Sequence, residues 1–118
     1  MTSPEELTAV IKQYLGHDWK LRRVIGSSDL IDIVNKGPVA NAEELPSKYF
    51  ELDCLWFSRT SRIGSETWEL RRVTGTPYAL VAVASDDLTP IEVEELLCTI
   101  EMEMIDSSGP RPDLGNQN

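Results

Sequence analysis

The middle of the chain reads Tyr-Phe-Glu-Leu-Asp-Cys-Leu-Trp-Phe-Ser-Arg over residues 49–59. Successive side chains of a β-strand point to opposite faces of its sheet. Phe50, Leu52, Cys54 and Trp56 would therefore share one face of such a strand. We predict that this segment is the longest strand of a sheet.

Four further segments on either side of it have the composition of strands. They are Trp19–Ile25 and Leu30–Val34, joined at Gly26, and Trp68–Thr74 and Tyr78–Ser85, joined by a hairpin turn at Gly75-Thr76. The segment Tyr78–Ser85 is apolar on both faces, which predicts a place in the centre of the sheet.

Helices are predicted at the two ends of this run of strands. Pro4–Leu15 follows a capping box of Ser3 and Glu6, and the helix from Pro90 to about Asp106 follows one of Thr89 and Glu92. Strands joined by short turns form antiparallel sheets. The predicted fold is α+β: an antiparallel sheet of about five strands with an N-terminal and a C-terminal helix packed on it, in the order α-β-β-β-β-β-α. Residues 1–106 would form one domain and residues 107–118 a disordered tail.

Composition narrows the classes of function. The 118 residues carry a net charge of −9, which argues against nucleic acid and anionic membranes as partners. The chain has no apolar run of membrane-spanning length, and its start lacks the features of a signal peptide, so we expect a cytoplasmic protein. It contains one histidine and two widely separated cysteines. We predict no metal site, no cofactor and no catalytic residues.

Two arginines raise the question of an anion site. The run Trp-Lys-Leu-Arg-Arg-Val-Ile-Gly at residues 19–26 recurs as Trp-Glu-Leu-Arg-Arg-Val-Thr-Gly at residues 68–75. Regular alternation would direct Arg23 and Arg72 toward an otherwise apolar face, where a buried guanidinium needs a partner. We expect partners within the chain, with Glu51 and Asp53 as candidates, although a bound anion would also serve. A β-bulge would reverse the direction of the side chain. Cross-strand pairs of Arg22 with Asp32 and of Arg59 with Glu66 are also expected.

The C-terminal helix is the most distinctive segment because it carries two apolar stripes. At 100° per residue, one stripe contains Val93, Leu96, Leu97, Ile100 and Met104. The second contains Ile91, Cys98, Met102 and Ile105, and Glu94 and Glu101 lie between the two stripes on one side. One stripe would pack on the sheet. The other would be covered by the N-terminal helix, by a second copy of the chain or by a different protein.

Charge favours a protein partner for this second stripe. Residues 74–118 contain nine acidic residues and one basic residue, Arg111. A basic partner would relieve the repulsion among these acids. The sequence therefore predicts a non-enzymatic protein-binding module of chaperone, inhibitor or adaptor type that forms a homodimer. Its predicted binding surface is made by Ile91, Glu94, Cys98, Glu101, Met102 and Ile105. Two alternatives remain: an anion-binding protein or enzyme that uses Arg23 and Arg72, and an assembly factor or subunit of a larger complex.

Overall fold

A computed structural model describes residues 4–36, 45–61, 63–75 and 78–108 of the chain. Its elements, in chain order, are α1 (Pro4–Leu15), β1 (Lys20–Gly26), α2 (Ser28–Lys36), β2 (Ser47–Tyr49), β3 (Cys54–Thr60), β4 (Glu66–Arg72), β5 (Tyr78–Ala84) and α3 (Pro90–Ser108). The predicted α+β class, with five strands and a helix at each end, is confirmed.

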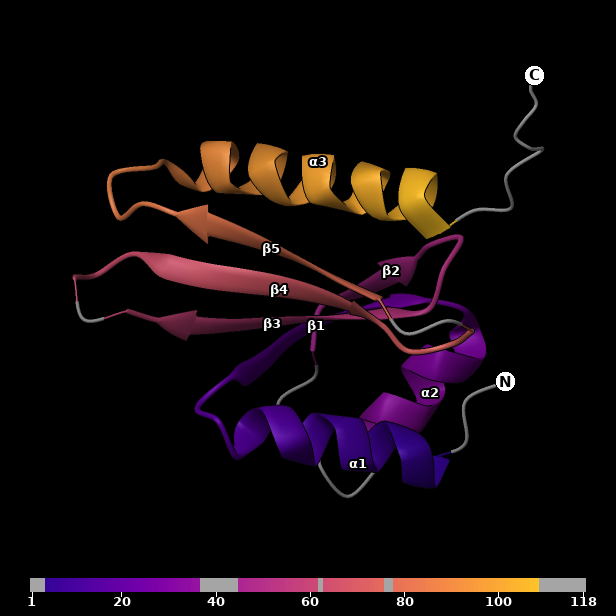
Figure 1. Cartoon of the computed structure of the whole chain (residues 1–118). Coiled ribbons are helices and arrows are strands. Elements are labelled where there is room, and N and C mark those ends of the chain that lie inside the picture. Colours follow the sequence, from indigo (N-terminus) through magenta and orange to yellow (C-terminus); the bar gives the residue numbers. More distant parts are fainter. Residues whose placement is uncertain (1–3, 37–44, 62, 76–77, 109–118) are drawn as a thin grey trace.

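The five strands form one sheet in the order β2-β1-β3-β4-β5 (Figure 1). The pairs β1–β3, β3–β4 and β4–β5 are antiparallel, as predicted. Strand β2 instead runs parallel to β1, which requires a long crossover between them. Helix α2 is part of that crossover.

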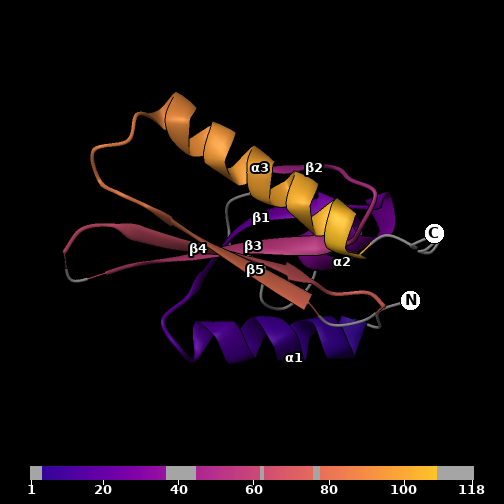
Figure 2. The ribbon, with the colours of Figure 1, turned by 45° about the horizontal axis from the view of Figure 1, so that its top comes forward.

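Helices cover both faces of the sheet, with α3 on one side and α1 and α2 on the other (Figures 1 and 2). Alternation along β3 separates the two cores. Trp56 and Cys54 pack with α3, whereas Leu55 and Phe57 pack with α1 and α2. Helix α1 therefore lies on the opposite side of the sheet from α3.

The predicted strand over Leu30–Val34 is wrong, because these residues belong to α2. Ser27 caps this helix: its hydroxyl accepts the backbone N–H of Leu30 at 3.2 Å, and its carbonyl accepts that of Ile31 at 3.1 Å. Leu30 and Val34 are the buried residues of α2, at a spacing of four. The spacing of the apolar residues fits a helix here, but their composition also suits a strand, which is why a strand was predicted.

The predicted strand over residues 49–59 is divided in the structure. Strand β2 ends at Tyr49, and β3 begins only at Cys54. Phe50 and Leu52 lie between the two strands but still pack against the same core as Cys54 and Trp56.

The predicted central position of Tyr78–Ser85 is also wrong, because β5 is an edge strand. Its side chains on the face away from α3, among them Val81 and Val83, are exposed. Helix α3 covers one face of β5, and no described helix covers the other. Apolar residues on both faces of a segment therefore indicate a strand, but they do not show whether that strand is central or lies at an edge.

A β-bulge interrupts β1. Leu21 pairs with Phe57, whereas Arg23 pairs with Trp56, so the register shifts by one residue between them. Leu21 and Val24 consequently both face α1, and Arg23 faces α3. The bulge therefore reverses the direction of the Arg23 side chain, which is one of the alternatives considered from the sequence.

The ends of the helices agree with their expected boundaries. At the start of α3, the N–H of Thr89 donates to Glu92 at 2.8 Å, and the N–H of Glu92 donates to the Thr89 hydroxyl at 3.1 Å, which confirms the second capping box. Helix α3 extends to Ser108, two residues into the segment predicted as a tail. Ser3 of the first box and residues 109–118 lie outside the described residues.

Candidate functional site

The second apolar stripe of α3 is largely open to solvent. Ile91 is 72% exposed and Met102 is 56% exposed. Cys98, which lies between them along the helix, is also exposed, and Ile105 is half-buried. The stripe therefore forms an apolar surface on the outer side of α3, away from the sheet.

The first stripe of α3 makes the contact with the sheet. Leu97, Ile100 and Met104 are buried against Trp68, Leu70 and other residues of β3, β4 and β5. Because α1 and α2 lie on the far face, neither of them reaches the exposed stripe (Figure 2). In the described part of the chain, α1 therefore does not cover the second apolar stripe of α3.

Glu101 has a different environment from the rest of the proposed binding residues. It is only 4% exposed, and its carboxylate accepts the indole N–H of Trp56 at 2.8 Å and the Lys48 ammonium at 2.7 Å. A buried carboxylate is tolerated when hydrogen bonds and an opposite charge replace its water. Glu101 thus fixes α3 to β2 and β3 and is not available to an outside partner.

Glu94 also lies at the inner edge of the exposed stripe, about two helical turns before Glu101. Its carboxylate receives two hydrogen bonds from the Arg23 guanidinium, one of them 3.0 Å long. These bonds lower the pKa of the Glu94 carboxyl and raise the pKa of Arg23. The partner expected for Arg23 within the chain therefore exists, but it is Glu94 and not Glu51 or Asp53.

These charged residues surround a cleft of about 300 Å³ beside α3. Its lining residues are Arg23, Ile25, Pro46, Ser47, Lys48, Glu94 and Glu101. Both cations of the cleft, Arg23 and Lys48, bind carboxylates of α3. The cleft therefore offers no excess of positive charge to an anion.

Arg72 does not join Arg23 at this cleft. It lies on β4, separated from β1 by β3, and its guanidinium packs against Gly75. Asp53, the other acid considered as a partner, accepts the backbone N–H of Ser27 at 2.8 Å. The structure thus does not bring the two candidate anion-binding arginines together.

The other arginine pairs also differ from the expected ones. Arg22 donates to Glu66 at 2.9 Å and to the buried hydroxyl of Ser58 at 2.7 Å, and it lies over the Trp68 ring. Arg59 lies over the Trp19 ring instead of meeting Glu66. Because Asp32 belongs to α2, it does not stand opposite Arg22 in a sheet.

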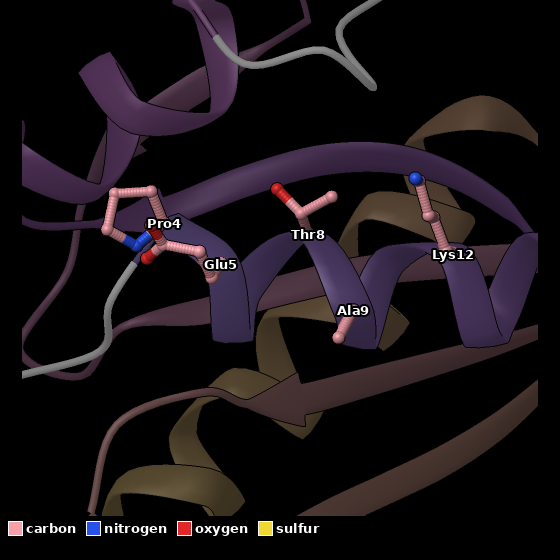
Figure 3. Close-up of a pocket in the computed structure, with 5 residues that line it drawn as sticks. All are labelled: Pro4, Glu5, Thr8, Ala9 and Lys12. Carbon is pink, nitrogen blue, oxygen red and sulfur yellow. The ribbon is translucent and has the colours of Figure 1, made fainter.

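A second cleft follows α1, where it is lined by Pro4, Glu5, Thr8, Ala9 and Lys12 (Figure 3). The labelled side chains project from successive turns of one helix and include a single acid and a single base. They do not form a cluster of nucleophile, base and acid of the kind that catalysis requires.

Sequence reasoning missed Lys48 and the role of Trp56. Lys48 and Glu101 are 53 residues apart, as are many pairs that never meet, so no local pattern signals their contact. Trp56 was expected on the apolar face of its strand, where its polar N–H requires an acceptor, and that requirement was the available signal.

The described residues contain no group of three or more histidine, cysteine or acidic side chains arranged to hold a metal ion. Among the same residues, no helix combines the length and the apolar character that a bilayer crossing needs. No protein-family model, curated protein or solved structure matches the chain.

Proposed function

We propose that this is a non-enzymatic, cytoplasmic protein-binding module, and that the exposed stripe of α3 is its docking surface. The observation that carries the proposal is the exposure of Ile91, Cys98 and Met102 along one line of a helix whose other stripe is already buried. A contiguous exposed apolar surface is typical of interaction sites. Methionine adapts its shape to different partners, which suits such a surface.

The charge of α3 defines the chemistry of the partner. The helix carries six acidic residues and no basic residue. Glu92, Glu95, Glu103 and Asp106 are exposed along its length, and Glu94 is also exposed although it binds Arg23. We propose a partner that presents apolar side chains flanked by lysine or arginine, such as an amphipathic basic helix. Two copies of α3 would repel one another, so this surface favours a foreign protein over a second copy.

Binding can be measured with a defined probe. The probe is a synthetic amphipathic helical peptide with leucine on one face and lysine on the other, titrated into the full chain by calorimetry. We expect Met102→Lys and Ile91→Lys each to weaken binding about tenfold, because each removes an apolar contact and repels the lysines of the peptide. Ile63→Lys is the matched control, since Ile63 is 83% exposed at the turn between β3 and β4.

A second peptide separates apolar docking from simple charge attraction. It keeps the lysines and replaces every leucine by serine, and we expect it to bind weakly to all variants. Equal affinity of the wild type, Met102→Lys and Ile63→Lys for the leucine peptide would contradict the proposal.

A further inference from the structure

The two edges of the sheet differ in their protection against pairing with another strand. Strand β2 has three residues, includes Lys48 and follows Pro46. Short length, a charge and a nearby proline are devices that keep an edge from pairing. Strand β5 has seven uncharged residues, Tyr-Ala-Leu-Val-Ala-Val-Ala, so it lacks the short length and the charge of β2, although Pro77 precedes it as Pro46 precedes β2.

The free side of β5 offers both hydrogen-bonding groups and apolar side chains. In an antiparallel pair, every second residue directs its N–H and C=O away from the neighbouring strand. Strand β5 pairs only with β4 among the described residues, so its outer row faces away from the sheet. Val81 and Val83 are 55% and 61% exposed on the face that no described helix covers.

We infer that β5 pairs antiparallel with β5 of a second copy of this chain, joining two five-stranded sheets into one. A strand is the partner that satisfies an outer row of backbone groups, and β5 itself is uncharged although the chain carries −9. A two-fold axis at Val81 would place Val81 opposite Val81 of the partner subunit. The exposed valines of both copies would then lie side by side, as favourable β-branched pairs do.

The acidic residues after β5 select the antiparallel arrangement. Asp86 and Asp87 follow the strand directly. In a parallel pair they would meet their own copies, whereas antiparallel pairing puts the two sets at opposite ends of the joined strands. This surface differs from the proposed docking stripe of α3, so the two inferences stand or fall separately.

The arrangement also predicts how association responds to salt. Glu94 and Glu101 point from α3 toward β1 and β2, so Glu92 and Glu103 lie on the opposite flank, toward the β5 edge. Pairing of the β5 strands would bring these flanks of the two α3 helices to the same side of the joined sheet. Added salt would screen their repulsion and strengthen the dimer. The variant Glu103→Lys would strengthen it without added salt.

Sedimentation of the full chain, at tens of micromolar and over a range of salt concentrations, tests the inference. We expect a dimer for the wild type, for Met102→Lys and for the matched control Ile63→Lys. Val81→Lys would be monomeric, because it sets two lysines against one another at the axis. Circular dichroism checks that this variant is folded, which its exposed position favours.

Cross-linking tests the register itself. In a Cys98→Ser background, Val81→Cys would form a disulfide-linked dimer on mild oxidation, since directly opposed residues lie within disulfide range. Ile63→Cys in the same background is the control and would stay unlinked. A wild type that is monomeric at every salt concentration, or a dimer that Val81→Lys leaves intact and Val81→Cys does not link, would overturn the inference.

Discussion

The Trp56 indole donates its N–H to the Glu101 carboxylate at 2.8 Å, and both side chains are buried between the sheet and α3. The second carboxylate oxygen binds Lys48 of β2 at 2.7 Å. One acidic side chain therefore connects the C-terminal helix to the centre of the sheet and to one of its edges. The same residue separates the exposed stripe of α3 from the cleft beside it.

Replacing Glu101 by alanine is expected to lower the free energy of unfolding by about 2–3 kcal/mol, because the buried Trp56 N–H loses its acceptor. Glu101→Gln would cost less, since an amide oxygen can still accept that N–H while the ion pair with Lys48 is lost. Urea denaturation measures both. Glu103→Ala on the exposed side of α3 is the control and should change stability little. Equal effects of Glu101→Ala and Glu103→Ala would show that the buried contact contributes nothing.

Gly26 is expected to tolerate no side chain. It has φ of 152°, and a Cβ at this position would come within 2.9 Å of the Asp53 Cα. Where the backbone suits alanine, replacing a glycine by alanine stabilises a protein by up to about 1 kcal/mol, and where it does not, the loss is larger than that. Gly26→Ala should therefore lower the free energy of unfolding by more than about 1 kcal/mol. Gly16→Ala is the matched control, because Gly16 has no positive φ and its Cβ would meet its nearest neighbour at 3.4 Å. Thermal unfolding compares the two, and a neutral Gly26→Ala would refute the steric account.

Local signals in the sequence predicted the parts of the fold that depend on neighbouring residues. The Thr89 and Glu92 box, the antiparallel pairing of β4 with β5 and the shared face of Cys54 and Trp56 all follow from spacing over a few residues, whereas Thr76 of the expected turn lies outside the described residues. Helix α2 was missed because Leu30, Ile31, Ile33 and Val34 suit a strand by composition and a helix by period.

Features set by distant contacts were not predictable in the same way. The edge position of β5 depends on which strands the helices cover, and its apolar sequence fits either place. The burial of Glu101 depends on Lys48 and Trp56, which lie far away in the chain. The second stripe of Ile91, Cys98 and Met102 was predictable from helical periodicity, but its exposure was not, because that depends on α1 packing on the other face of the sheet.

Acidification is expected to remove the contribution of the Arg23–Glu94 pair. The hydrogen bonds from Arg23 hold the pKa of Glu94 in the folded chain below its usual value near 4.3. The ionised carboxylate therefore stabilises the fold above about pH 4.3, and this contribution disappears as the pH falls through the lower, folded-state pKa. Because both side chains are partly exposed, we expect Glu94→Gln to cost at most about 1 kcal/mol at pH 7.

Urea denaturation at pH 7 and pH 3 measures the difference between wild type and Glu94→Gln, which should shrink at pH 3. Glu95→Gln, at an exposed position next along α3, serves as the control for removing a charge. If the stability difference between wild type and Glu94→Gln grew on acidification, the Arg23–Glu94 ion pair could not be its cause.

The two cysteines are expected to differ sharply in reactivity. Burial raises the pKa of the Cys54 thiol to about 12, so almost no thiolate is present near neutral pH, whereas Cys98 is exposed on α3. Iodoacetamide should add one group to the folded chain, at Cys98, and a second only after denaturation. Mass spectrometry of peptides locates each adduct, and Cys98→Ser should leave the folded chain unmodified.

Because Cys98 lies within the exposed stripe, the leucine and lysine peptide should slow its alkylation while the serine peptide should not. Rapid labelling of Cys54 in the folded chain would contradict its burial, and an unchanged rate at Cys98 with saturating leucine peptide would place the docked peptide elsewhere.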